Sequence, residues 1–193
     1  MYLQIFMLDS LHNLNIICAD FVFGDNIMAL EIERKFLVSA ESLSNIHMTD
    51  GEKIAQGYLC TDIDKTVRVR IKNNRGYICV KTKNIGIVRN EFEYEIPVED
   101  AEELLKICAP NILSKIRYKI DYKNHVWELD IFEGKLAGLI IAEVEIKSAD
   151  EFVEIPSWAG REVSDDPRFY NVRLIFESED FIKNILAVEN KSN

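Results

Sequence analysis

The chain has 193 residues, of which 48% are hydrophobic and 29% charged, and its formal net charge at pH 7 is −10. This length suits one domain that buries its own core, and the composition is that of an ordinary soluble globular protein. The acidic balance argues against a nucleic-acid surface, which needs a basic stripe, but it leaves room for a small polyanionic ligand.

The first 27 residues differ from the rest of the chain. They contain no Lys or Arg and carry Asp9, Asp20 and Asp25, so they lack the basic start and the unbroken apolar stretch of a signal peptide. The periodic pattern begins abruptly after Met28. We therefore expect residues 1–27 to be an N-terminal extension, poorly specified or upstream of a natural start at Met28, and residues 28–193 to form one domain. A short ordered segment packed on that domain is the alternative.

Alternation of apolar and polar residues dominates from residue 31 onward. It predicts eight strands, at about 31–38, 54–61, 66–72, 76–83, 88–97, 112–121, 125–132 and 139–147. Two stretches are typical of helices, at about 99–108 and about 168–188, and short turns are expected near 40–46 and 149–153. Short connections between strands favour an antiparallel meander. The predicted fold is mainly β (α+β), an eight-stranded antiparallel β-barrel tunnel with flanking helices and a C-terminal helix.

The spacing of the cysteines and the length of the apolar stretches indicate the cellular compartment of the protein. Cys18, Cys60, Cys79 and Cys108 form no CxxC pair, which argues against a zinc site and indicates buried thiols in a reducing compartment. No stretch reaches the apolar length needed to span a bilayer. We therefore predict a cytoplasmic protein without a membrane partner.

The polar faces of the predicted strands carry charges where solvated strands would carry Ser, Thr, Asn and Gln. In any single strand this alternation is explained by one face in the core and one in water. Like charges nevertheless recur two residues apart, on one face, as in Arg68 and Arg70 or Glu91 and Glu93, and this is repulsive unless something neutralises them. One sheet thus supplies a set of cations and a set of carboxylates.

The two sets together fit a complex of a metal ion with a triphosphate. Arg binds phosphate oxygens through two parallel hydrogen bonds, and Lys acts as a point charge. Carboxylates do not bind phosphate, but they hold Mg²⁺, which does. We therefore expect the charged face to point into the barrel and the apolar face to be covered by helices.

The residues also resemble a known family. Glu31-Ile32-Glu33-Arg34-Lys35 resembles the ExExK signature of the CYTH superfamily, the triphosphate tunnel metalloenzymes. Further resembling segments follow in order, and they are Gln56-Gly57-Tyr58, Val67-Arg68-Val69-Arg70, Val80-Lys81-Thr82, Arg89-x-Glu91-Phe92-Glu93-Tyr94, Lys115-x-Arg117-Tyr118, Trp127-Glu128-Leu129-Asp130-x-Phe132, Ala142-Glu143-Val144-Glu145 and Tyr170-Asn171. The resemblance covers about residues 29–177 and is closest to bacterial inorganic triphosphatase-like members.

The resemblance implies roles for the charged residues. The implied phosphate ligands are Lys35, Arg68, Arg70, Lys81, Arg89, Lys115 and Arg117, with Lys35 and Lys81 as catalytic residues near the scissile phosphate. The implied ligands of one or two Mg²⁺ or Mn²⁺ ions, or groups that position water, are Glu31, Glu33, Glu91, Glu93, Asp130, Glu143 and Glu145. We expect Lys72, Lys83, Glu95, Lys119, Glu128 and Lys147 near the tunnel mouths, Arg34 in a surface pair, and Trp127 and Trp158 in apolar packing.

The predicted activity is metal-dependent hydrolysis of inorganic triphosphate to phosphate and pyrophosphate, by a monomer or a homodimer. No motif recognises a nucleobase or a sugar, and this favours the naked triphosphate. The alternatives are a nucleoside or thiamine triphosphatase, a class IV type adenylyl cyclase, and a non-catalytic polyphosphate-binding module.

Overall fold

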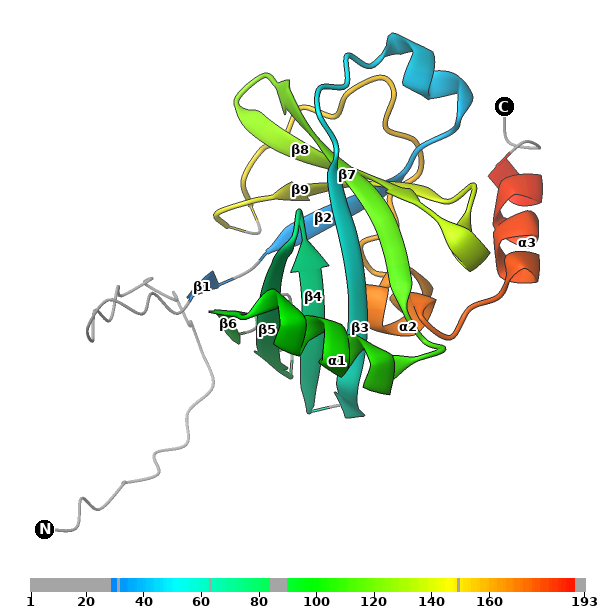
Figure 1. Ribbon diagram of the computed structural model, residues 1–193. Helices are drawn as coiled ribbons and strands as arrows, with labels where there is room; N and C mark the ends of the chain where they lie inside the picture. Colours follow the sequence, from blue (N-terminus) through cyan, green and yellow to red (C-terminus); the bar gives the residue numbers. More distant parts are fainter. Residues whose placement is uncertain (1–28, 31, 63, 84–89, 149, 190–193) are drawn as a thin grey trace, which may run out of the picture.

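The structure is a computed structural model that describes residues 29–30, 32–62, 64–83, 90–148 and 150–189. Its main feature is one antiparallel sheet (Figure 1). The strands are β1 (Ala29–Leu30), β2 (Glu33–Leu37), β3 (Glu52–Asp62), β4 (Lys65–Lys72), β5 (Arg75–Thr82), β6 (Asn90–Ile96), β7 (Leu113–Tyr122), β8 (His125–Phe132) and β9 (Ile140–Glu145). All eight predicted strands are present, as β2 to β9, and the short β1 precedes the first of them. The prediction of a mainly β, antiparallel fold is confirmed, whereas the predicted extension at 1–27 lies outside the described residues.

The two edges of the sheet are formed by neighbouring parts of the chain. The strand order is β1-β6-β5-β4-β3-β7-β8-β9-β2, so β1 and β2 lie at opposite edges although only residues 31 and 32 separate them. β1 pairs with β6 and β2 pairs with β9. The short connection between β1 and β2 therefore brings the two edges towards each other. Among the described residues no ladder joins β2 to β6, so the tunnel is a wrapped sheet that hydrogen bonds do not fully close.

An extended segment from late in the chain covers the outer edge of β2. Leu37 N donates to Arg161 O at 2.9 Å, and Val163 N donates to Lys35 O at 2.8 Å. Gly160 N donates to Leu37 O at 2.8 Å, and a Cβ at Gly160 would lie 2.8 Å from the same oxygen, so this approach requires glycine. The segment satisfies backbone groups of β2 that would otherwise be left open, and it fixes the backbone of Lys35.

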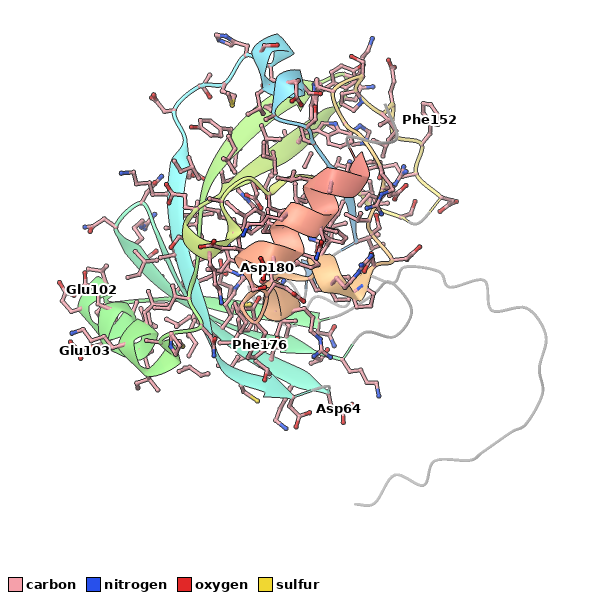
Figure 2. The ribbon with its side chains drawn as sticks, turned by 90° about the vertical axis from the view of Figure 1, so that its right-hand side faces the viewer. Asp64, Glu102, Glu103, Phe152, Phe176 and Asp180 are labelled. Carbon is pink, nitrogen blue, oxygen red and sulfur yellow. The ribbon has the colours of Figure 1, made fainter. Side chains whose placement is uncertain are left out.

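The first predicted helix is confirmed as α1 (Val98–Cys108), which packs Ala101, Leu105 and Cys108 against Val69 of the sheet. Glu102 and Glu103 are exposed and project from its outer face (Figure 2). The expected turn near 40–46 is η1 (Glu41–Asn45), and a turn bond from the N of residue 151 to the O of residue 148 lies in the second expected region. Within the described ranges, no helix has the length and apolar character needed to cross a membrane.

The predicted helix at 168–188 is wrong as a continuous element. The region contains η3 (Pro167–Phe169), α2 (Asn171–Leu174) and α3 (Glu179–Glu189), separated by non-helical residues. Tyr170 is extended, with φ −72° and ψ 132°, and this ends the first turn. The breaks let Ile175 and Ile182 reach the same apolar cluster. Phe176, which lies between α2 and α3 and is labelled in Figure 2, stays outside the cluster and is 56% exposed.

The apolar faces of the strands point outward and form the core. One cluster joins Leu113 and Ile141 of the sheet to Leu174 of α2 and Ile185 of α3. Leu136 of the short η2 (Gly134–Leu136) packs in the same cluster. A second cluster surrounds Trp127, whose ring lies 5.4 Å from that of Phe36 and 5.5 Å from that of Trp158. Both tryptophans thus lie in apolar packing as predicted. The charged faces are left to line the inside of the sheet.

Candidate functional site

A cavity of about 1270 Å³ lies along the inner face of the sheet. Charged side chains from β2, β4, β5, β6, β7 and β9 line it, namely Glu33, Lys35, Arg68, Arg70, Lys81, Glu91, Glu93, Lys115, Arg117, Glu143 and Glu145. The structure therefore brings together most of the residues that the sequence singled out. Glu31 and Arg89 lie outside the described residues.

Four strands, β2, β7, β8 and β9, form what we call the paired wall, because its charges neutralise one another at short range. The Arg117 guanidinium donates to Asp130 Oδ1 through Nε and to Asp130 Oδ2 through Nη2, both at 2.6 Å. Its Nη2 also lies 2.6 Å from Glu143 Oε2. Lys35 Nζ donates to Glu143 Oε1 at 2.5 Å and lies 2.8 Å from Glu33 Oε1, and Lys115 Nζ donates to Asp130.

Strand register explains these pairs. Arg117 on β7 lies opposite Asp130 on β8, and Lys35 on β2 lies opposite Glu143 on β9. Side chains directly opposite on one face of an antiparallel pair lie about 5 Å apart at Cβ, within reach of a cation–carboxylate contact. The alternating sequence of each strand thus becomes a two-dimensional network once the strands are aligned.

The network sets the protonation of its members. Burial alone would raise the pKa of the Glu143 carboxyl, but Lys35, Arg117 and Lys115 outweigh burial and hold that pKa well below its usual range. Burial lowers the pKa of Lys35, yet Glu143 and Glu33 more than compensate and raise it. The pKa of Lys115 is lowered, by burial and by the nearby Arg117 charge. Glu143 is therefore ionised and Lys35 protonated at neutral pH.

Three strands, β4, β5 and β6, form what we call the open wall. Arg70 Nη2 donates to both oxygens of Glu93 at 2.8 Å, whereas Arg68 Nη2 reaches Glu91 and Glu93 only at 3.4 and 3.3 Å. Lys81 Nζ lies 2.9 Å from Glu91 Oε2. The Nε atoms of Arg68 and Arg70 are buried and find no hydrogen-bond acceptor in the described part of the chain. This wall therefore holds donors that its own carboxylates do not satisfy.

Two uncharged residues in the site received no role from the sequence, because roles were assigned to charged residues alone, although Gln56 belongs to one of the resembling segments. Cys79, two residues before Lys81 on the same face of β5, donates to Glu91 Oε1 at 2.9 Å, and burial raises the pKa of its thiol to about 12. Gln56 is 1% exposed and lines the cavity opposite Arg70 in the strand register. The spacing of Cys79 from Lys81, and the place of Gln56 on an alternating strand, were the available signals.

The residues predicted near the mouths divide into two groups. Lys83, Lys119, Glu128 and Lys147 line the cavity, whereas Lys72 and Glu95 make ion pairs with Glu52 and Arg75 at 2.9 and 2.8 Å. Arg34 makes the expected surface pair, with Glu162 at 2.6 Å. Phe176 also lines the cavity, which places an exposed aromatic ring beside these charges.

The carboxylates of β2 and β9 fit a divalent metal ion. Glu33 lies directly opposite Glu145, and both line the cavity. Like charges placed opposite each other on a sheet are destabilising, and Lys35 Nζ, 2.8 Å from Glu33 Oε1, offsets part of this repulsion. Carboxylate oxygens are the ligands that Mg²⁺ and Mn²⁺ prefer. A second group, Cys79, Glu91 and Glu93, has its ligand atoms within 4.8 Å of one another. Arginine and lysine engage both of its carboxylates, as they also engage Glu33 and Glu143.

Residues 29–170 match the CYTH domain, and the chain therefore belongs to the CYTH domain family. An inorganic triphosphatase of Acetivibrio thermocellus is 43% identical over 149 residues, which are 77% of this chain and 94% of that protein. An inorganic triphosphatase of Nitrosomonas europaea is 34% identical over 149 residues, 75% of this chain and 95% of that protein. A crystal structure of an inorganic triphosphatase, 31% identical, superposes with a TM-score of 0.56 over 78% of this chain and 97% of its own. The resemblance drawn from the motifs is thus confirmed.

Proposed function

We propose that the protein hydrolyses inorganic triphosphate to phosphate and pyrophosphate inside this tunnel, with Mg²⁺ or Mn²⁺. The main support for this proposal is the set of unsatisfied donors on the open wall. The side chains of Arg68 and Arg70 line the cavity together with Lys81, and their buried Nε donors have no acceptor in the described residues. Buried donors without partners are costly, and an anion with several oxygens is the ligand that satisfies guanidinium groups. The similarity to two inorganic triphosphatases supports the same activity.

Cations from both walls would bind the substrate. Arg68, Arg70 and Lys81 would bind phosphate oxygens from the open wall, and Lys35, Lys115 and Arg117 from the paired wall, with Arg89 added from outside the described residues. Groups fixed in a buried site stabilise charge that develops on the transferred phosphoryl group, because they need no reorganisation as the bond breaks. Lys35 and Lys81 are the proposed catalytic residues, since each is buried and tied to a carboxylate that keeps it in place.

The metal would be held at the β2–β9 end of the tunnel. Glu31, Glu33 and Glu145 are the proposed ligands, with Glu143 on the same strand as Glu145, and Glu91 and Glu93 line the same cavity from the open wall. A bound Mg²⁺ or Mn²⁺ neutralises phosphoryl oxygens and lowers the pKa of a coordinated water. The protein's own part is to keep Glu143 and Lys35 paired, so that an anionic substrate meets a lining of balanced charge.

The activity is tested by measuring phosphate release from tripolyphosphate, ATP and thiamine triphosphate with Mg²⁺ or Mn²⁺, and by assaying cyclic AMP. We expect kcat/KM for tripolyphosphate to exceed that for ATP by at least about tenfold, a difference of ~1.4 kcal/mol. Equal or better turnover of ATP would contradict the narrow proposal. It would favour a nucleoside triphosphatase, for which the exposed ring of Phe176 at the cavity offers a stacking surface.

Two substitutions separate the proposed roles. Glu145→Ala should raise the metal concentration required for half-maximal activity, whereas Lys81→Ala should raise KM for tripolyphosphate with the metal requirement nearly unchanged. Arg75→Ala, which removes an exposed pair with Glu95, is the matched control for loss of a strand cation. If both test variants keep activity within a few-fold of the wild type, the inward-facing tunnel is not the active site.

A further inference from the structure

Asp130 differs from the other carboxylates of the tunnel in having no face open to the cavity. It is 0% exposed, and it is absent from the lining of the cavity to which its partners Lys115 and Arg117 contribute. A Mg²⁺ or Mn²⁺ ion keeps several coordinated waters, so its protein ligands must border space that can hold them. Asp130 has no such space.

Both oxygens of Asp130 are already occupied. Oδ1 accepts from Arg117 Nε at 2.6 Å, and Oδ2 accepts from Arg117 Nη2 at 2.6 Å and from Lys115 Nζ. The paired hydrogen bonds to Arg117 use one edge of the guanidinium and fix its plane. Its Nη1 is then directed to Glu128, a residue that lines the cavity. The carboxylate therefore sets the direction in which Arg117 presents its Nη1 group.

Lys115 depends on the same carboxylate. Its side chain is 2% exposed, and it lies beside the Arg117 cation, with its Nζ 5.4 Å from the centre of the Phe132 ring. A buried ammonium next to another cation is unfavourable unless a counter-charge is present. Asp130 lies opposite Arg117 in the strand register and is the carboxylate that contacts both cations through hydrogen bonds.

Glu143 provides the contrast within the same wall. It also binds Arg117, but it lines the cavity and reaches across to Lys35. Asp130 thus lies behind the cations and Glu143 lies among them. We propose that Asp130 is a positioning residue, which holds Lys115 and Arg117 towards the substrate, and that it is not a ligand of the metal. This role rests on the proposed function and replaces the metal-ligand role that the sequence suggested.

The first test compares Asp130→Asn with Glu145→Gln. Asparagine keeps the shape of the side chain, removes its charge and loses one acceptor. We expect Asp130→Asn to raise KM for tripolyphosphate about tenfold and to leave the Mn²⁺ concentration for half-maximal activity within about twofold of wild type, assayed well below each variant's Tm. Glu145→Gln should instead raise the Mn²⁺ requirement by about fivefold or more. A rise in the Mn²⁺ requirement of Asp130→Asn as large as that of Glu145→Gln would overturn the proposal.

A double-mutant cycle tests whether Asp130 acts through Arg117. Two independent roles multiply their effects on KM, whereas a positioning role is partly lost once its target has gone. The combined effect of Asp130→Asn and Arg117→Gln should therefore fall short of the product of the single effects by about threefold or more. A combined effect equal to that product would show that Asp130 does not act through Arg117.

The wild-type protein gives a test that does not depend on folding of the variants. In crystals soaked with Mn²⁺, the anomalous signal should place the ion away from Asp130, with no coordination bond of about 2.0 to 2.5 Å to either of its oxygens. An ion bound directly to Asp130 would refute the positioning role. A wild-type protein that releases no phosphate from tripolyphosphate would refute the proposed function, and the Mn²⁺ position would still decide whether Asp130 is a ligand.

Discussion

The two walls of the tunnel carry the same kinds of side chain but satisfy them to different degrees. On the paired wall, Arg117 makes three hydrogen bonds of 2.6 Å to two carboxylates. On the open wall, Arg68 reaches its carboxylates at 3.3 and 3.4 Å, and its Nε has no acceptor among the described residues. The carboxylates of the paired wall thus satisfy Arg117 closely, whereas those of the open wall leave the Nε donors of Arg68 and Arg70 without an acceptor among the described residues.

This difference predicts that the two walls contribute differently to stability and to ligand affinity. A buried ion pair adds little net stability, because desolvation offsets its attraction, but removal of one partner leaves a buried charge and is strongly destabilising. An unsatisfied buried donor costs about 1 to 3 kcal/mol, which a bound ligand can recover. The paired wall should therefore contribute more to folding than the open wall does. The open wall should contribute more to affinity for triphosphate, although Lys35, Lys115 and Arg117 of the paired wall also face the substrate.

The largest expected effect is on the paired wall. Glu143→Gln leaves Lys35 and Arg117 without their shared carboxylate, and we expect a loss of about 3 to 5 kcal/mol in the free energy of unfolding, measured with urea. Arg68→Ala, the corresponding change on the open wall, should cost much less. If the two variants lose stability equally, the distinction between the walls is wrong.

Substrate binding should show the reverse order. Charge-assisted hydrogen bonds contribute about 1.5 to 3 kcal/mol, so Arg68→Ala should raise KM for tripolyphosphate by about 10-fold to 100-fold. Tripolyphosphate without metal should also raise Tm of the wild type, and this rise should nearly vanish in the variant. A full rise in Tm for Arg68→Ala would mean that Arg68 does not bind the anion.

Acid should lower the free energy of unfolding by protonating Glu143 of the paired wall. The pKa of Glu143 is lower in the folded chain than in the unfolded chain, where a glutamate has a pKa of about 4.3. The folded state then binds fewer protons, so this stability is present above the unfolded pKa and is lost as pH falls below it, by up to ~1.4 kcal/mol per pH unit. Urea unfolding between pH 7 and pH 3 should show this slope, and Glu143→Gln should flatten it. An unchanged slope in that variant would exclude Glu143 as its source.

The smallest expected effect is at the outer rim. Arg75 is 63% exposed and pairs with Glu95 at 2.8 Å. Arg75→Ala should change the free energy of unfolding by less than about 0.5 kcal/mol, because water screens an exposed pair, and should leave KM unchanged. A tenfold rise in KM would extend the phosphate-binding surface beyond the cavity lining.

The sequence by itself determined the strands, the inward charged face and the family. Period-two alternation from residue 31 onward locates all eight predicted strands, because the pleat of a strand leaves few other ways to bury one face. The motifs that begin at Glu31 were enough to identify the CYTH domain family, which residues 29–170 match.

Only the tertiary structure decided how deep each charge lies and what it faces. Alternation put Asp130 and Glu143 on the charged side alike, but register and curvature buried Asp130 behind two cations and left Glu143 at the cavity. The long helix expected at 168–188 failed for a related reason, since its periodicity ran across the extended Tyr170 and the non-helical residues after Leu174. A one-dimensional pattern fixes the side of a strand that a residue occupies, whereas depth and partners depend on strands distant in the sequence.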